Sequence, residues 1–197
     1  IAPGTRRPFV TSPLDSSEFG EIPVDALNVA ADNYWVVSEA MRTRILAADW
    51  AGDVPDAVVR AAKATAYHEG PLYHDSFTDW RGRVYCMSGE YGSMLHNKAV
   101  RAMLEAPEAE EVDEAAYNYM LHLIEDEHDV TEANHLEVMD STITSPSDAM
   151  RVRAALAINE VLTTGRTAYL LEQDASCSGG QIIAMLTGDY NLAEATN

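Results

Sequence analysis

The sequence predicts an α+β fold that is mainly helical and has few strands. Long segments carry apolar residues at helical spacing, and only a few short apolar runs have the length of a strand. Hydrophobic residues make up 47% of the 197 residues, which is typical of a folded chain rather than a disordered one. A chain of this length can bury the core of about one domain, or of one and a half.

Helices are predicted in the following order along the chain. Apolar spacing predicts one over residues 24–48, and Pro55 stands in the first turn of another that runs to about Tyr67. Residues 113–139 are expected to form one long helix or two. A last helix is predicted over 147–164, with a Ser-Pro-Ser-Asp sequence that suits N-capping at its start.

Two short runs are predicted to be strands. Residues 168–173 are mostly apolar and include a tyrosine, so they predict a buried strand, and residues 84–87 predict another. The expected organisation is therefore an extended, Pro- and Ser-rich arm (1–23), a helical segment (24–70) and a mixed segment (71–197).

The charge is strongly negative, because 13 Lys and Arg face 32 Asp and Glu and leave a net charge of −19. Such a field repels free duplex DNA. The acids are dense at residues 105–114 and 125–129, which we expect to be solvated helix faces. A group of cations lies apart from them in the sequence: Arg81, Arg83, Lys98 and Arg101. A basic partner chain could supply more positive charge.

No run of 18 apolar residues and no signal peptide is visible, so no membrane span is expected. The two cysteines lie far apart in the sequence, which favours a reducing compartment without a disulfide framework. The first residue is Ile rather than Met, which favours processing from a longer chain.

Residues 174–181, Asp-Ala-Ser-Cys-Ser-Gly-Gly-Gln, come directly after the strand predicted over 168–173. Two-metal nucleotidyl transfer needs a carboxylate that bridges the ions and a backbone without bulky side chains beside a triphosphate. An acid at a strand end followed by small residues offers both. The alternative is an aspartate in a Ser/Gly-rich turn, where its carboxylate accepts hydrogen bonds from nearby backbone amides.

Residues 79–85, Asp-Trp-Arg-Gly-Arg-Val-Tyr, form the second notable block. Arg81 and Arg83 have the spacing of one strand face, and a guanidinium fork suits phosphate oxygens. Tyr85 could stack on a base or sugar. Alternatively, Asp79 pairs with one of the arginines across a turn, and the aromatic residues fill a core.

In this order the two blocks resemble the single-subunit RNA polymerases of bacteriophages and mitochondria. Residues 79–85 are similar to the family's Asp-Trp/Phe-Arg-Gly-Arg block, which contacts template and hybrid near the active site. Residues 174–181 are similar to its motif A, whose aspartate binds both catalytic magnesium ions. The resemblance implies part of a right-hand polymerase palm, with residues 24–70 corresponding to helices that descend from the thumb.

The resemblance also implies roles for particular residues. Asp174 would be the catalytic aspartate that ligates Mg²⁺, with the carbonyl of Ala175 as a candidate backbone ligand. The residues that would face nucleic acid or the incoming nucleotide are Arg81, Arg83, Tyr85, Ser178, Gly179 and Gln181. The family usually has Gly at the position of Ala175, and a His often stands where this chain has Ile182.

Motifs B and C, which follow motif A in the family, are not found before Asn197. The resemblance therefore implies a fragment, or one subunit of a DNA-directed RNA polymerase that is active only with a partner carrying those motifs. Its ligands would be a DNA template, nascent RNA and ribonucleoside triphosphates. It would act in the host cytoplasm during phage infection or be packaged in the virion. The alternative is a virion structural or interaction protein with polymerase ancestry.

Two other patterns suggest different chemistry. Residues 74–77, His-Asp-Ser-Phe, spell motif C and would place a second metal-binding acid, Asp75, in this chain if the motif order were permuted. The pairs Glu125/His128 and Glu132/His135, with His122 nearby, have the spacing of di-iron carboxylate ligands. They would suit a metal-dependent hydrolase. Solvated Glu/His pairs on a single exposed helix are the simpler interpretation.

Overall fold

The computed structural model describes residues 34–73, 76–78, 84–86, 97–171, 183–184, 186–189 and 191–192, and for 76–78 and 84–86 it describes the backbone alone. This part of the chain is α+β and mainly helical, as predicted. The helices are α2 (Glu39–Leu46), α3 (Asp56–Ala66), α4 (Lys98–Arg101), α5 (Glu114–His128), α6 (His135–Met139) and α7 (Pro146–Thr164). The strands are β1 (Tyr34–Val37), β2 (Leu72–Tyr73), β3 (Ser76–Thr78), β4 (Val84–Cys86), β5 (Leu104–Glu105), β6 (Glu110–Glu111) and β7 (Arg166–Thr167).

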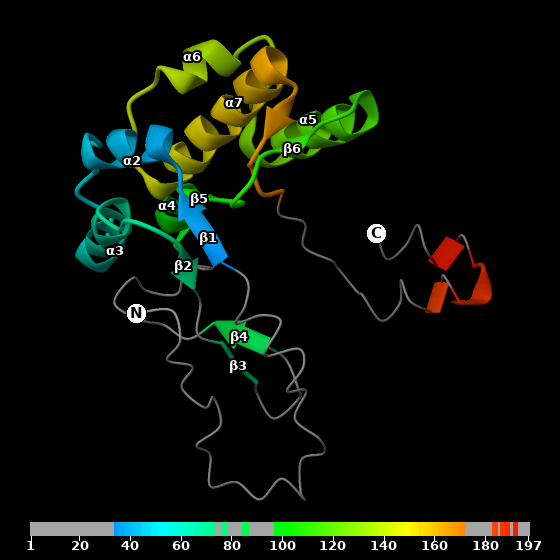
Figure 1. Ribbon diagram of the computed structural model, residues 1–197, viewed down its shortest axis with the longest axis horizontal. Coiled ribbons are helices and arrows are strands. Elements are labelled where there is room, and N and C mark those ends of the chain that lie inside the picture. Colours follow the sequence, from blue (N-terminus) through cyan, green and yellow to red (C-terminus); the bar gives the residue numbers. More distant parts are fainter. Residues whose placement is uncertain are drawn as a thin grey trace, which may run out of the picture.

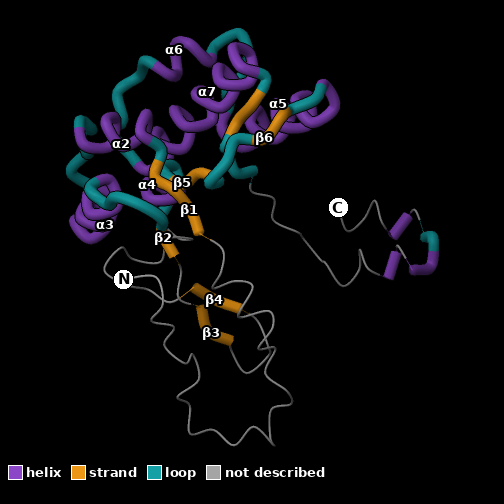
Figure 2. The backbone as a smooth tube through the Cα atoms, in the orientation of Figure 1, coloured by secondary structure: helices purple, strands orange, loops and turns teal. Residues whose placement is uncertain are grey.

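Helix α7 is the centre of the helical body, and the other helices lie around it (Figures 1 and 2). Every residue from Val152 to Ile158 is buried, which is two full turns. A helix that is buried all round must be covered on every side by other elements. Four of these seven residues are Ala or Val, whose small side chains let the neighbouring helices approach closely.

Two hydrophobic clusters share α7. One joins it to α2, α3 and α4 through residues that include Met41, Ala62 and Ala99. The other joins it to α5 and α6 through Ile124 and Val138, among others. Burial of apolar surface on both sides of one helix makes α7 the element on which the whole body depends.

Strand β1 is the middle strand of a small antiparallel sheet with the order β2-β1-β5. Tyr34 pairs with Tyr73 of β2, and Val37 pairs with Leu104 of β5. A third hydrophobic cluster, built on Ala61, Leu72, Val100 and Leu104, packs against this sheet. Two further antiparallel pairs, β3 with β4 and β6 with β7, complete the strands of the described residues.

The predicted helices over 113–139 and 147–164 are confirmed, the former as the pair α5 and α6. The helix predicted after Pro55 is confirmed as α3, which Pro55 precedes as the N-cap residue. The strand predicted over 84–87 is confirmed as β4.

The helix predicted over 24–48 is wrong at residues 34–37, where the chain forms β1. The sequence Tyr-Trp-Val-Val is aromatic and β-branched throughout, and β-branched side chains favour strands. None of these four residues is buried, so burial does not decide between a helix and a strand here, whereas pairing with β2 and β5 does. A helix follows only from Glu39, after Ser38.

The strand predicted over 168–173 is wrong for residues 168–171, which form no strand, while 172–173 lie outside the described residues. The regular pairing with β6 ends at Thr167, and one further backbone bond joins Ala106 to Ala168. The Thr167 hydroxyl then accepts the backbone N–H of Tyr169 at 3.1 Å, a local bond that replaces a ladder bond.

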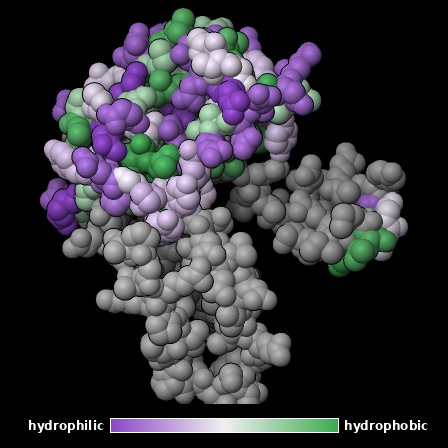
Figure 3. Space-filling view, in the orientation of Figure 1, coloured by the Kyte–Doolittle hydropathy of each residue, from purple (hydrophilic) through white to green (hydrophobic). Residues whose placement is uncertain are grey.

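The acidic stretch 105–114 was expected to be a helix face, but it forms β5, β6 and the connections between them, and α5 begins only at Glu114. Its acids at 108, 110 and 111 are exposed, so the expectation of solvation is confirmed for them. Hydrophilic residues cover much of the face of the helical body seen in Figure 3, with small apolar patches between them. Among the helices of the described residues, none has the length and apolar character needed to cross a membrane.

Helix α7 starts with a complete capping box. The Ser145 hydroxyl accepts the backbone N–H of Asp148 at 3.2 Å, and the Asp148 carboxylate accepts the backbone N–H of Ser145 at 2.9 Å. Burial alone would raise the pKa of the Asp148 carboxyl, but hydrogen bonds from Thr144 and Ser145 outweigh it and hold the pKa below its ordinary value. The cap satisfies amides that the helix itself cannot pair.

We predict that Ser145→Ala lowers the free energy of unfolding by about 1 kcal/mol, since it removes the hydroxyl that accepts the Asp148 amide. Urea denaturation followed by circular dichroism measures the change. The matched control is Ser147→Ala, an exposed serine of the same first turn, which should change stability by only a few tenths of a kcal/mol. Equal effects of the two substitutions would contradict the role of the cap.

Candidate functional site

Most residues of the predicted polymerase site lie outside the described residues: Asp174, Ala175, Ser178, Gly179, Gln181, Arg81 and Arg83. Tyr85 lies in β4, where the backbone alone is described. Their roles therefore stay predictions. What the structure does describe is the chain on both sides of the arginine block and the chain that leads to Asp174.

The arginine block is bounded by the antiparallel pair of β3 and β4. Thr78 pairs with Val84, Phe77 with Tyr85 and Ser76 with Cys86. Residues 79–83 are thus the connection between two paired strands. The motif C-like sequence at 74–77 enters the same hairpin, because its last two residues belong to β3, while His74 and Asp75 lie outside the described residues.

The chain that leads to Asp174 runs antiparallel to the segment after β5. The backbone N–H of Val112 donates to the carbonyl of Gly165 at 3.0 Å, and that of Ala106 donates to the carbonyl of Ala168 at 3.0 Å. Between these bonds, β6 and β7 pair. Gly165 ends α7 with φ of 71°, a left-handed conformation that turns the chain out of the helix and suits glycine.

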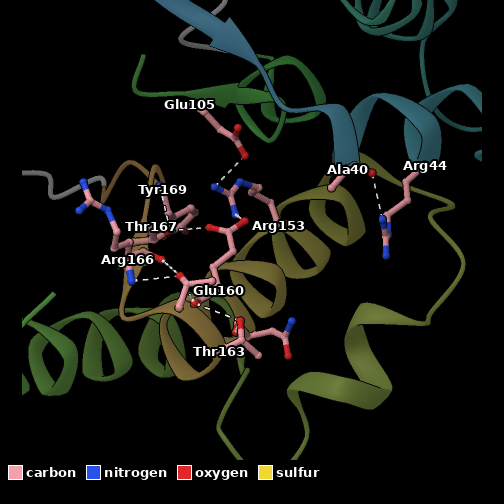
Figure 4. A network of polar contacts seen from close by, with 11 residues as sticks. Ala40, Arg44, Glu105, Arg153, Glu160, Thr163, Arg166, Thr167 and Tyr169 are labelled. Carbon is pink, nitrogen blue, oxygen red and sulfur yellow. Dashed lines mark hydrogen bonds and ion pairs between the residues drawn. The ribbon is translucent and has the colours of Figure 1, made fainter. Parts of the chain in front are cut away.

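Arg153 of α7 ties this segment to the core. Its side chain is 1% exposed, and its guanidinium lies 3.0 Å from the Glu105 carboxylate and 3.2 Å from that of Glu160 (Figure 4). Glu160 in turn accepts the Thr167 hydroxyl at 2.6 Å. The Arg153 guanidinium carbon also lies 5.0 Å from the centre of the Tyr169 ring, a cation–π contact. One buried cation therefore joins α7, β5 and the residues just after β7.

The two approaches to the predicted site meet in the third hydrophobic cluster. Leu72, at the start of β2, is 3% exposed and belongs to its buried part. Leu170, the fourth residue before Asp174, packs against the same cluster. The chain entering the arginine block and the chain entering the aspartate block thus contact the same cluster, which also contains Val100 and Leu104.

The two Glu/His pairs lie on different elements of the described residues. Glu125 and His128 lie in the last turn of α5, whereas Glu132 stands between the helices and His135 opens α6, so the expectation that both pairs share one helix is wrong. The imidazole of His135 makes a 2.7 Å hydrogen bond with the Glu132 carbonyl. Within the described residues, no three His, Cys, Asp or Glu side chains come together as metal ligands.

His128 instead marks a cationic region. Burial lowers the pKa of its imidazole below the ordinary value, and the nearby charges of Lys98, Arg101 and Arg151 act in the same direction, while the Glu127 carboxylate opposes them. Arg151 donates its Nε–H to the His128 carbonyl at 3.0 Å. Lys98 and Arg101, noted in the sequence for their closeness to the arginine block, thus belong to α4 and gather with an arginine of α7.

Sequence reasoning missed Arg153 and Arg151. The sequence could have pointed to Arg153, because it is the one charged residue among the small and apolar residues 152–158. A charge in such a segment must be paired if the segment is buried. No sequence pattern points to Arg151, since its neighbours in space are far from it in sequence.

Comparison with protein-family models and with curated protein sequences finds no match for the chain.

We predict that Arg153→Met destabilises the protein by about 2–4 kcal/mol, because it leaves the Glu105 and Glu160 carboxylates in the core margin without their cation. Chemical denaturation measures the loss. Glu111→Gln is the control, since it removes the exposed ion pair with Arg166, at 3.2 Å, from the neighbouring β6–β7 pair. That change should cost no more than about 0.5 kcal/mol. If Arg153→Met also cost no more than about 0.5 kcal/mol, the buried network would not be what holds residues 167–169 to the core.

We predict that stability falls as the pH is lowered from about 6.5 towards the depressed pKa of folded His128, because the unfolded chain then binds a proton that the folded chain resists. His128→Asn should weaken this pH dependence. Urea midpoints at pH 7.5 and 5.5 test it. His122→Asn, an exposed histidine of the same helix, should keep the pH dependence of the unsubstituted protein. Identical curves for the His128 variant and the unsubstituted protein would contradict the prediction.

Proposed function

We propose that this chain is a subunit or fragment of a DNA-directed RNA polymerase of the single-subunit type, and that it contributes part of the palm. It would supply the motif A aspartate, Asp174, while a partner polypeptide or the rest of the same chain supplies motifs B and C. The reaction would be nucleotidyl transfer, in which the 3′-hydroxyl of the growing RNA attacks the α-phosphate of a ribonucleotide and pyrophosphate leaves.

One observation carries the proposal: the approaches to both sequence blocks pack on one hydrophobic cluster, through Leu72 and Leu170. Four residues of extended chain span at most about 14 Å, which bounds the distance from Leu170 to Asp174. Thr78, the partner of Val84, is five positions after Tyr73, a distance of at most about 18 Å along extended chain. A carboxylate and two guanidiniums on such short tethers can serve one active site.

The Arg153 network supports the same proposal, because it holds the chain that leads to Asp174 against the central helix. Catalysis requires reacting groups to be held within fractions of an ångström, and sites supported by rigid elements achieve this better than free loops. Arg153, Glu160 and Tyr169 fix the chain five residues before Asp174 to the central helix. We infer that this network positions the segment that leads to Asp174.

The donor set implied by the resemblance suits magnesium in kind, because a carboxylate of Asp174 and a backbone carbonyl of Ala175 are hard oxygen ligands. One carboxylate is too few for two ions, so the second metal-binding acid would come from motif C. Bound magnesium would lower the pKa of the attacking hydroxyl and stabilise the leaving pyrophosphate.

The other residues of this chain would bind and orient the nucleic acid. Arg81 and Arg83 would hold phosphates of template or hybrid, and Tyr85 would stack on a base or sugar. Ser178, Gly179 and Gln181 would shape the floor beside the incoming nucleotide.

We predict that Asp174→Asn in the assembled enzyme reduces RNA extension by about a thousandfold or more, because a neutral amide with a single oxygen cannot bridge the two catalytic ions and several kcal/mol of transition-state stabilisation is lost. Extension of a labelled primer on a DNA template by the co-purified complex measures it. Asp126→Asn, an exposed acid of α5, is the control and should leave extension unchanged.

Asp75→Asn belongs in the same assay. A loss comparable with that of Asp174→Asn would favour the permuted motif order. Full extension by the Asp174 variant would overturn the proposal, and so would assembly of this chain only with capsid or tail proteins. Extension by this chain alone would contradict the need for motifs B and C from elsewhere.

A further inference from the structure

We propose that Tyr34, Tyr73 and Arg42 form a stacking site for one base of a single-stranded nucleic acid, at the edge of the β2-β1-β5 sheet. The inference rests on the proposed function for the source of that strand, which would be the unpaired template or the transcript. The contacts that carry it are all in the described residues and involve neither sequence block.

The two tyrosines form an exposed aromatic surface. They are direct cross-strand partners on β1 and β2, and their ring centres lie 5.6 Å apart with planes tilted by 45°. Tyr34 is 38% exposed and Tyr73 is 57% exposed, so the pair is fixed by the sheet without being covered. Rigid, exposed aromatic rings on a small sheet are the surface on which single-stranded nucleic acids stack their bases.

The rings line a surface hollow of about 420 Å³, together with Pro71 and the side chain of Arg42. This volume is in the range of small-ligand sites and accommodates a nucleotide. Apolar walls with one cationic group match a base and its phosphate. Gly70 and the valines of β1, Val36 and Val37, complete the lining, so the hollow combines aromatic and apolar residues with one basic residue.

Arg42, the basic residue of the hollow, is held in place. Its guanidinium donates to the His68 carbonyl at 3.0 Å, and its Nε lies 3.4 Å from the Glu39 carboxylate. Glu39 is 80% exposed, so this ion pair is weak and a phosphate can replace its carboxylate beside the guanidinium. The structure thus offers a pre-positioned cation whose present partner is easily displaced.

The position in the chain favours nucleic acid over a peptide as the occupant. Tyr73 is the last residue of β2, and the chain continues from it into the β3–β4 hairpin that bounds Arg81 and Arg83 (Figure 1). The hollow therefore lies only a few residues along the chain from the predicted nucleic-acid contacts. The site cannot take duplex DNA, because stacked and paired bases do not offer a free face to a tyrosine ring.

We predict that Tyr73→Ala weakens binding of single-stranded nucleic acid to the full chain at least about fivefold, because stacking on the ring is lost. Fluorescence anisotropy of a labelled oligothymidine of about 12 nucleotides measures it. Tyr73→Phe keeps the ring and should bind within about twofold of the unsubstituted chain. Tyr67→Ala, at a tyrosine that is 72% exposed and does not line the hollow, is the matched control and should have no effect.

A change of opposite sign sharpens the test. Glu39→Gln should strengthen binding by about twofold or more, since the phosphate no longer competes with a carboxylate for Arg42. An abasic strand of the same length keeps the phosphates, and its binding should not respond to Tyr73→Ala. Comparison of oligothymidine with oligouridine identifies whether the DNA or the RNA strand is preferred.

No detectable oligonucleotide binding, equal losses for Tyr73→Ala and Tyr67→Ala, or equal sensitivity of the abasic strand would each overturn the inference. Loss of partner co-purification without any effect on oligonucleotide binding would also overturn it, in favour of a protein-docking role. The outcome is separable from the proposed function, which fails only in the extension assay. If oligonucleotide binding depended on Tyr73 but the assembled complex showed no extension activity, the stacking site would be supported and the proposed function would not.

Discussion

The ion pairs of Arg153 are the interaction on which the arrangement of this protein depends. A guanidinium that is almost wholly removed from water must have carboxylate partners, and those partners come from β5 and from the next turns of α7 itself. The sheet and the helical body are thereby fixed to one another. The same cation holds Tyr169 and, through Glu160, Thr167, so the chain leaves the core in a defined direction. Apolar packing around α7 gives stability, and the ion pairs of Arg153 fix how α7 and β5 lie relative to each other.

The fold class and the longer helices could be predicted from the sequence because their signals are local. Pro55 marks the start of α3, and the Ser145/Asp148 capping box marks the start of α7. Apolar spacing could not separate a helix from a central strand at Tyr34–Val37, since the same apolar residues suit either structure and the choice depends on partners more than thirty residues away. The end of β7 at Thr167 likewise depends on a side-chain hydroxyl that competes for an amide, which periodicity does not register.

The residues of the candidate site likewise fall into those that the sequence could reveal and those that it could not. Asp174 and the two arginines could be singled out because chemistry of that kind needs those residue types at short spacing, and the resemblance rests on the same residues. Tyr34 and Tyr73 could not, because nothing in either run predicts that they face each other across two strands. Arg42 owes its place beside them to a backbone carbonyl of His68, and a contact of that kind leaves no trace in the sequence. The net charge of −19 argued against nucleic acid as a ligand, yet Lys98, Arg101 and Arg151 gather around His128. Local placement of cations matters more than their total.

The contact of Leu170 with the cluster that contains Leu72 has a kinetic consequence. The two residues are about a hundred positions apart, so closing that loop costs more chain entropy than any helix–helix contact between sequence neighbours. Helices that meet their neighbours locally can condense first, and the joining of distant segments must wait for them. The packing of α2 on α7, in which Met41 and Val152 share a cluster, closes a loop of similar length, so both approaches to the predicted catalytic blocks would become ordered together with that part of the body. A nascent chain that has not yet released residue 170 from the ribosome cannot complete this surface, whatever part of its body has already folded.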